Sequence, residues 1–285
     1  MLIDPIRRLL ARVLSHPLLR RSVVRLGRFL SNAGRLDMPY GIEDNGEARV
    51  QEIVTKRAAQ RPIRVMDVGV FKGWWTESLL RVAGTQQSEI EVLLFEPSPR
   101  IHDALQEKLQ SWDTPANLEL IQCALSDRQG TAQFHFVEGQ GGSDSLHKHA
   151  LFSNDLAVAD VTLNTVDAFC AERGIEQVTL LKSDTEGNDL PLLRGAVGML
   201  ERQQIEVIQI EYSHIWVTSG CFLKEAMELL QGYGYAFGKV TPRGIEFYEG
   251  WHPELETFQL GNYLACLPSW RDRFPQIEWW NASRD

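Results

Sequence analysis

Acidic side chains follow two apolar runs of this chain at the spacing of one strand–helix–strand unit. The stretch V-M-D-V-G-V-F-K-G places Asp67 and Gly69 at the end of the first run, and Gly73 opens a helical stretch. The second run, V-L-L-F-E-P, ends in Glu96. This layout is typical of a nucleotide-type cofactor site at the carboxyl ends of parallel strands, where Glu96 can accept hydrogen bonds from both ribose hydroxyls.

The first turn does not have the dinucleotide form G-x-G-x-x-G. Asp67 stands where the first glycine of that motif would be, and a carboxylate there would repel a pyrophosphate. The form D-x-G-x-x-x-G suits a cofactor without phosphate, such as S-adenosylmethionine. We therefore expect Asp67 to accept a hydrogen bond from the cofactor ammonium or a water, and Gly69 to let the backbone approach the ligand.

A third segment, C-A-L-S-D, follows the next apolar run, where an adenine ring would lie. We expect Ala124 to offer a small surface there and Asp127 to accept from the exocyclic amine. The alternative for Asp127 is a turn that its side chain closes locally.

A fourth segment, L-L-K-S-D-T-E-G, brings three charges to the end of a buried run: Lys182, Asp184 and Glu186. Burying so many charges is costly unless they pair with one another or bind something. We interpret all three as catalytic residues, with a structural Lys–Glu pair as the alternative.

If the cofactor is S-adenosylmethionine, transfer of its methyl group to a hydroxyl needs a base or a metal, because a hydroxyl is a poor nucleophile. We select His214, in I-E-Y-S-H, as the base because imidazole titrates near neutral pH; a surface or packed histidine is the alternative. Asp184, Glu186 and Glu211 could instead hold a divalent cation on oxygen ligands, which we do not favour. No metal site is therefore predicted.

Two further groups could contact an acceptor. His147 and His149 follow a glycine-rich loop, although a solvated loop explains them equally. Tryptophan faces stack on sugar rings, but they also serve core or interface packing; the candidates are Trp216, Trp251, Trp270, Trp279 and Trp280.

Alternating strand and helix patterns must position these residues. The pattern predicts a parallel sheet with right-handed crossovers. The expected strands are Ile63–Val68, Ile90–Phe95, Leu118–Cys123, Val178–Ser183 and Ile205–Ile210, with Tyr235–Val240 and an antiparallel Phe258–Leu267 closing the sheet. Two alternating runs, Thr131–Val137 and Ala157–Leu163, suggest a small antiparallel insertion.

Composition sets the class of protein. At 285 residues and 44% hydrophobic content, the chain fits one large α/β domain with extensions. Its four scattered cysteines argue against a zinc site and against disulfides, so we expect a cytoplasmic protein. The net charge of −9 argues against general nucleic-acid binding.

The charge is unevenly distributed. Residues 1–36 contain eight arginines and one acid, Asp4, so they carry +7 and the remainder carries −9 − 7 = −16. Apolar residues alternate with these arginines, which predicts a basic amphipathic helix pair broken at His16-Pro17. No uncharged run approaches the ~20 residues of a membrane span. We expect a cap or homodimer arm, with peripheral docking on an anionic inner membrane surface as the alternative.

Several motifs occur together in order: D-V-G-x-x-x-G, F-E-P-S-P, A-L-S-D-x-x-G, T-L-N-T-V-D, L-K-S-D-T-E-G-N-D and L-R-G-A. In this combination the chain resembles the FkbM family of S-adenosylmethionine-dependent methyltransferases. At the first turn, Val70-Phe71-Lys72 replace the small and amide residues common in that family.

The resemblance implies a class I methyltransferase (Rossmann-like) α/β fold: a mostly parallel seven-stranded sheet with helices on both faces, a small antiparallel insertion and an N-terminal helical arm. We divide the chain into a basic arm (1–42), a methyltransferase domain (43–267) and a C-terminal tail (268–285).

The implied activity is O-methylation of a hydroxyl on a sugar, glycoconjugate or related natural product. By position, Asp67 and Gly69 would hold the methionine part of S-adenosylmethionine, Glu96 the ribose and Asp127 the adenine. Asp184 and Glu186 would line the methyl-transfer pocket. The alternatives are an NAD-dependent oxidoreductase on a similar sheet, which the carboxylate of Asp67 disfavours, and a non-catalytic binding subunit.

Overall fold

The computed structural model describes residues 3–37, 41–57, 62–137, 145–146 and 156–282. The chain forms two compact units, one of residues 1–39 with 280–285 and the other of residues 40–279. Among the described residues, no helix combines the length and apolar character needed to cross a membrane.

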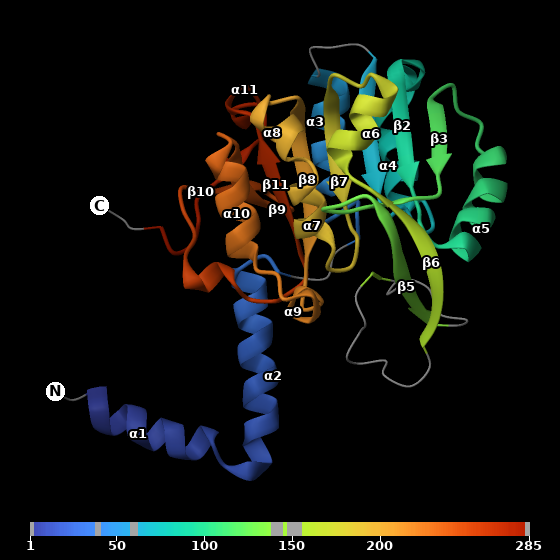
Figure 1. The fold of residues 1–285 in the computed structure, drawn as a ribbon. Coiled ribbons are helices and arrows are strands. Elements are labelled where there is room, and N and C mark those ends of the chain that lie inside the picture. The colour runs from blue at the N-terminus through green and yellow to red at the C-terminus, as the bar shows by residue number, and fades with distance from the viewer. Residues whose placement is uncertain (1–2, 38–40, 58–61, 138–144, 147–155, 283–285) are drawn as a thin grey trace. The chain divides into compact units, whose positions relative to one another are not determined.

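A mostly parallel sheet forms the centre of the larger unit (Figure 1). Its strand order is β12-β10-β9-β11-β8-β7-β1-β2-β3, so the predicted count of seven strands is wrong and the sheet has nine. The bounds are β1 Ile63–Val68, β2 Ile90–Phe95, β3 Asn117–Ile121, β7 Val178–Ser183, β8 Ile205–Tyr212, β9 Ala236–Thr241, β10 Gly244–Tyr248, β11 Gly261–Cys266 and β12 Gln276–Ile277. The arrangement fits the class I methyltransferase fold.

The two extra strands lie at one edge. β10 pairs antiparallel with β9, and the two-residue β12 pairs parallel with β10. β11 is antiparallel to both β8 and β9, as the sequence predicted for the closing strand. Residues 268–279, which we expected in a tail, therefore contribute β12, and Trp270 among them is buried.

Helices cover both faces of the sheet because successive strand residues alternate in direction. Met66 and Val68 pack in one buried cluster, whereas Ile63 and Val65 pack in the other. The first cluster includes residues of α6 Val166–Arg173, α7 Asp189–Arg194, α8 Val197–Glu201 and α10 Leu223–Gly232. The second includes residues of α3 Glu47–Arg57, α4 Trp74–Ala83, α5 Pro99–Gln110 and α11 Pro268–Arg271.

Local chemistry sets the helix boundaries. The Thr165 side chain accepts a hydrogen bond from the Ala168 amide and starts α6. The helical segment after β7 is divided into α7 and α8. A side chain at Gly195, between them, would overlap the carbonyl oxygen of Ser126, so the close approach of that loop coincides with the break. Short helical turns complete the unit: α9 Trp216–Ser219 and the 3-10 turns η1 Gly84–Glu89 and η3 Pro253–Leu255.

A second sheet of three strands is mixed in direction. β5 Gly130–Val137 pairs antiparallel with β6 Leu156–Asn164, and β4 Ala124–Leu125 pairs parallel with β6. Figure 1 shows β5 and β6 extending beyond the carboxyl ends of β2 and β3. This sheet therefore adds a wall to the region where the polar strand ends meet.

The smaller unit contains two helices, α1 Ile3–Leu14 and α2 Pro17–Gly34. The break falls at the predicted place, since His16 precedes α2 and its Nδ1 accepts a hydrogen bond from the Leu18 amide. None of the described residues of α2 is buried.

Candidate active site

A cavity of about 360 Å³ lies at the carboxyl ends of four neighbouring strands. Its lining includes Gly69 after β1, Glu96 after β2, Asp184 after β7 and Glu211 in β8. β4 contributes Ala124 to the same lining. A volume of this size is typical of small-molecule sites. The fold therefore brings together strand ends that are up to 142 positions apart in sequence.

Glu96 forms a fixed anionic wall of this cavity. Its carboxylate accepts hydrogen bonds from the Phe71 amide at 3.0 Å and the Ser98 amide at 2.9 Å, and the residue is 4% exposed. Each carboxylate oxygen has two lone pairs, so acceptor capacity remains for a ligand. This geometry allows the predicted contact with ribose hydroxyls.

Gly69 has a reason for being glycine that the sequence did not reveal. Its φ is +85°, in the left-handed region, and a side chain there would overlap the carbonyl oxygen of Asp184. The Asp184 amide in turn donates to the Val68 carbonyl oxygen at 3.0 Å. Gly69 lines the cavity as predicted, but the close approach that it permits in this structure is to the loop after β7.

Asp67 lies beneath the cavity rather than in its lining. The residue is fully buried, and its Oδ2 accepts a hydrogen bond from the Thr76 hydroxyl at 2.6 Å. Its Oδ1 lies 3.5 Å from Nζ of Lys182, which follows from the parallel register that places these two residues side by side. Burial raises the pKa of Asp67, although Lys182 and Thr76 favour its ionised form. Asp67 is not among the described residues that line the cavity, and its hydrogen bond to the cofactor ammonium or to a water stays a prediction.

Lys182 is a buried cation that joins two carboxylates. Its Nζ lies 3.2 Å from Oδ2 of Asp184 and also faces Asp67. Burial opposes the charged form, but nearby carboxylates, Asp184 first among them, raise the pKa of Lys182 above its ordinary value. Lys182 therefore stays protonated near neutral pH and is a positioning residue rather than a base.

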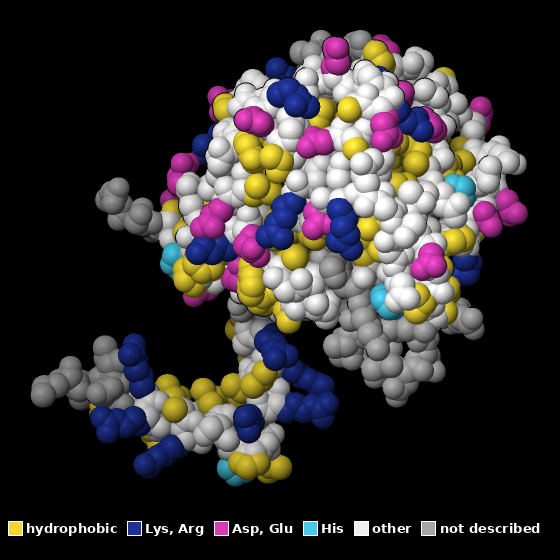
Figure 2. Space-filling view, in the orientation of Figure 1, with side chains coloured by type: hydrophobic (Ala, Val, Ile, Leu, Met, Phe, Trp, Pro, Cys, Tyr) yellow, Lys and Arg dark blue, Asp and Glu magenta, His cyan; other side chains and the backbone are white. Residues whose placement is uncertain are grey.

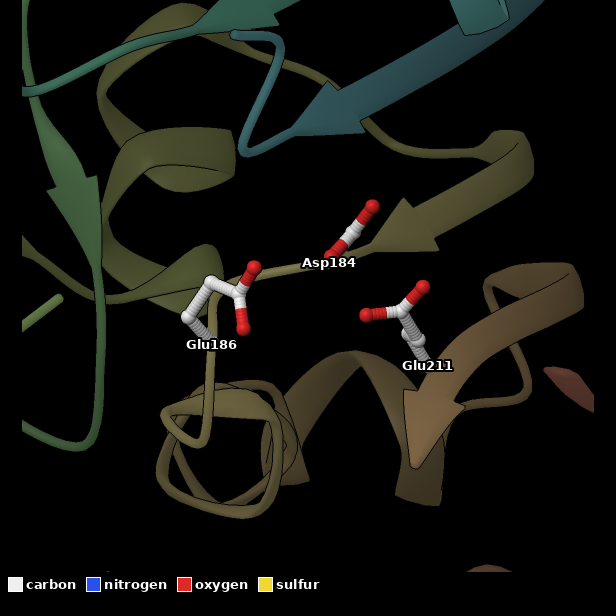
Figure 3. A group of neighbouring side chains, drawn as sticks. All are labelled: Asp184, Glu186 and Glu211. Carbon is white, nitrogen blue, oxygen red and sulfur yellow. The ribbon is translucent and has the colours of Figure 1, made fainter. Parts of the chain in front are cut away.

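Three carboxylates form the floor of the cavity: Asp184, Glu186 and Glu211, called the acidic floor below. One oxygen from each lies within 4.8 Å of the others, and Figure 3 shows the carboxyl groups pointing into a common space. Burial raises the pKa of Glu211, and the charges of Asp184 and Glu186 raise it further. Such a group can take up a proton at near-neutral pH or bind a divalent cation through oxygen ligands.

An unusual backbone conformation presents one member of the acidic floor. Glu186 has a φ of +52°, which is uncommon for a residue other than glycine, and Gly187 follows at +95°. The Glu186 carbonyl oxygen accepts a hydrogen bond from the Ser145 hydroxyl at 2.7 Å. Strained residues of this kind cluster at functional sites, which supports a role for the loop after β7.

Other predicted site residues lie elsewhere. Gly73 has a φ of +74° and packs closely against Leu105 and Trp112, so its lack of a side chain serves the junction of α4 with α5. Asp127 is exposed and its Oδ1 pairs with Arg128 at 3.1 Å. Neither is among the described residues that line the cavity.

His214, our predicted base, is exposed just after β8 and does not line the cavity as described. The chain turns away from the strand end at this point, and Ile215 and Trp216 pack inward instead. The interpretation as a surface histidine fits this placement, and Glu211 takes the position beside the other carboxylates. His147 and His149 lie outside the described residues.

Apolar and aromatic side chains form much of the remaining lining, and sequence reasoning missed them. They include Phe71, Trp74, Ile101 and Phe134. Phe71 has a φ of +51° and belongs to the atypical V-F-K segment, which was the available signal. The five tryptophans that we proposed for sugar stacking are absent from the described lining, and Trp216 and Trp270 are buried in the core.

Comparison with known proteins places this geometry in a family. The family model described as "Methyltransferase FkbM domain" matches residues 67–237. The 2-O-methyltransferase NoeI of Sinorhizobium fredii is 25% identical over 209 residues, covering 69% of this chain and 81% of NoeI. The methyltransferase sdnD of Sordaria araneosa is 24% identical over 182 residues, covering 55% and 67%.

A solved structure of a methyltransferase FkbM from Methylobacillus flagellatus KT shares 14% identity, with a TM-score of 0.43. The alignment covers 71% of this chain but 43% of that one, so this chain spans less than half of the solved protein. Because the family model matches more than half of its length, the chain belongs to the FkbM family of methyltransferases.

Proposed function

We propose that the protein transfers the methyl group of S-adenosylmethionine to a hydroxyl of a sugar, glycoconjugate or related natural product. The observation that carries this proposal is the pairing of Glu96 with the acidic floor in one small-molecule cavity. The name of NoeI, a 2-O-methyltransferase, supports oxygen as the atom methylated.

The cofactor would occupy the end of the cavity near Glu96. Glu96 would accept hydrogen bonds from the ribose hydroxyls, and Ala124 with Leu125 would border the adenine. Asn188 supports this border, since its side-chain amide donates to the Leu125 carbonyl oxygen at 2.8 Å. Because Gly69 has no side chain, the methionine portion of S-adenosylmethionine would lie between the first turn and the acidic floor.

The acidic floor would activate the acceptor. In the reaction, the hydroxyl oxygen forms a bond to the methyl carbon as the sulfur–carbon bond breaks, and the hydroxyl proton passes to a carboxylate. Glu211 is our candidate base because it lines the cavity beside Asp184 and Glu186, and burial raises its pKa, which makes its carboxylate a stronger proton acceptor. In-line placement of the hydroxyl supplies much of the acceleration, and Lys182 holds Asp184 in position.

Trp74 is our candidate for contact with the acceptor. It is 54% exposed while lining the cavity, and Nζ of Lys72 lies 5.0 Å from its ring centroid. An exposed aromatic face beside a polar site suits stacking on a sugar ring.

Calorimetry with S-adenosylhomocysteine tests the cofactor end. We expect binding by the full chain and a loss of affinity of roughly 10²- to 10⁴-fold in Glu96→Ala, because two hydrogen bonds from the ribose hydroxyls to a charged group would be removed. Glu52→Gln, on an exposed face of α3, is the matched control and should bind as the wild type does. No binding by the wild type would overturn the cofactor assignment.

Transfer of labelled methyl groups tests the acceptor class. The full chain is incubated with labelled S-adenosylmethionine and separate glycan, glycolipid and polyketide pools. Label in an alkali-stable ether of a sugar supports the proposal. Label confined to nitrogen or carbon atoms contradicts O-methylation, and cofactor binding without any transfer favours a non-catalytic binding subunit.

A further inference from the structure

We propose that the N-terminal helices α1 and α2 form a docking surface for an anionic lipid bilayer. The observations concern this unit alone, and they are independent of the methyl-transfer chemistry. The surface is called the arm below and consists of residues 3–34.

The arm exposes an unusual share of large apolar side chains. Ten of the sixteen large hydrophobic side chains exposed in the described structure belong to it. In α2, Leu19, Val23, Leu26 and Leu30 follow at intervals of four, three and four, so they lie along one side of the helix. Figure 2 shows a yellow stripe of such side chains along the arm. A contiguous exposed apolar face of this kind marks an interaction site.

The arginines occupy other sides of the same helices. In α2, Arg21, Arg25 and Arg28 follow at intervals of four and three, which places them on the side opposite Leu19, Leu26 and Leu30. In α1, Arg8 and Arg12 have the same spacing of four residues. Long arginine stems can extend their charged ends toward the headgroups while the apolar face is buried.

The charge of the arm favours an anionic lipid surface over a second copy of the arm as its partner. Residues 3–34 carry seven arginines against one acid, Asp4, a net charge of +6, so two arms in contact would bring +6 against +6. Paired helices normally match opposite charges beside their apolar seam. Anionic headgroups supply the opposite charge, and the acyl boundary accepts the apolar side chains.

One contact at the end of the arm fits the same partner. The Arg35 guanidinium lies 5.5 Å from the ring centroid of Trp280, and both residues belong to the smaller unit. Trp280 is 50% exposed. Arg35 also pairs with Asp37 at 3.0 Å, so Trp280 is the exposed group of this contact, and tryptophan is enriched at the boundary between membrane and water.

Vesicle co-sedimentation of the full chain tests the proposal. We expect binding to phosphatidylcholine vesicles that contain 30% phosphatidylglycerol, and at least tenfold weaker binding to phosphatidylcholine alone. Since each basic residue near such a surface changes partitioning about fivefold, R21Q/R25Q/R28Q should lose roughly 100-fold. L19A/L26A/L30A should lose at least tenfold, because buried methylene groups are removed while helix propensity is kept.

The matched control is K56Q/R128Q/R271Q, which removes the same charge from exposed ion pairs of the larger unit. It should bind vesicles as the wild type does, and circular dichroism checks that every variant keeps its helices. Equal loss in this control would overturn the proposal, because net charge alone would then explain binding. A lipid-free dimer that L19A/L26A/L30A abolishes, without vesicle binding, would assign the arm to a second copy. Binding to duplex DNA or RNA that survives L19A/L26A/L30A, again without vesicle binding, would assign the arginines to nucleic acid.

Discussion

The two ends of the cavity use carboxylates in opposite ways. At one end, two backbone amides hold Glu96 in place, and its oxygens are oriented before any ligand arrives. At the other, Asp184, Glu186 and Glu211 face one another, and burial together with neighbouring negative charge raises the pKa of Glu211. A carboxylate held by donors is suited to binding, whereas a carboxylate crowded by other carboxylates is suited to taking a proton.

The largest expected effect comes from removing the proton acceptor. Glu211→Gln should lower kcat by roughly 10²- to 10⁴-fold, the range for a general base. The affinity for S-adenosylhomocysteine should change less than about twofold, because binding depends on the other end of the cavity. Steady-state kinetics and calorimetry on the same preparation separate the two effects, and Glu201→Gln, at the exposed last residue of α8, is the control.

The pH dependence of the wild type gives a second check on Glu211. The base must be ionised to accept a proton, so kcat should rise with pH through the raised pKa of Glu211. That limb should disappear in Glu211→Gln. If Glu211→Gln loses cofactor affinity but keeps kcat, that result would contradict the division of roles between the two ends of the cavity.

Removing the buried cation should destabilise the acidic end. Lys182→Met leaves Asp67 buried without its ion-pair partner, which costs about 3–5 kcal/mol of unfolding free energy. Urea unfolding measures this loss. Adding Asp67→Asn to the variant should recover part of it, since the uncompensated charge is then gone. Lys56→Met, at an exposed pair, should cost less than about 1 kcal/mol, and an equal loss there would show that Lys182 has no special role.

A smaller effect concerns Asp189, which lies under the loop after β7. Burial raises the pKa of Asp189 to about 6, although the Ser183 hydroxyl donates to its Oδ1 at 2.6 Å. A raised folded pKa means that its favourable contribution is full below the unfolded value of 3.8 and is lost as pH rises through about 6. The loss is at most about 3 kcal/mol, from 1.36 kcal/mol per pKa unit.

Asp189→Asn should therefore flatten the decline in unfolding free energy between pH 4 and pH 7. The measurement is urea unfolding across that range, with the exposed Asp160→Asn as the control. If both variants follow the wild-type pH profile, Asp189 does not titrate in this window.

The smallest expected effect is that of chelation. We expect EDTA to change the methylation rate less than about twofold, because Lys182 already supplies positive charge beside Asp184. Loss of activity that Mg²⁺ restores would show that the acidic floor binds a cation. In that case one end of the cavity would bind the cofactor through Glu96, and the other end would bind a metal ion through the acidic floor.

The carboxyl ends of the parallel strands, and the polar residues that follow them, were predictable from the sequence. Glu96, Asp184 and Gly69 lie where a parallel sheet brings carboxyl ends together, because that outcome depends on local patterns alone. The pairing of Asp67 with Lys182 was not predictable, since it depends on register between strands 115 positions apart. His214 was misjudged because a strand pattern does not indicate which way the following turn leaves the sheet.

The strands at the edge of the large sheet could not be predicted from local sequence patterns either. β12 has two residues, too few for any alternation to be visible, and β10 has five residues that pair with β9 and β12. The apolar lining escaped prediction for a related reason: Phe134 comes from the second sheet, and only tertiary packing places that sheet over the strand ends.

The contact between Gly69 and Asp184 has a consequence for redesign. The loop after β1 and the loop after β7 meet main chain to main chain at Gly69 and Asp184, with no side chain between them. A change of side-chain rotamer therefore cannot alter the distance between these two loops. Under the proposed function, this contact would fix the spacing between the methyl donor and the proton acceptor. Variation aimed at new acceptors should therefore leave positions 69 and 184 untouched and diversify Trp74 and Phe134, whose side chains can be exchanged without altering that spacing.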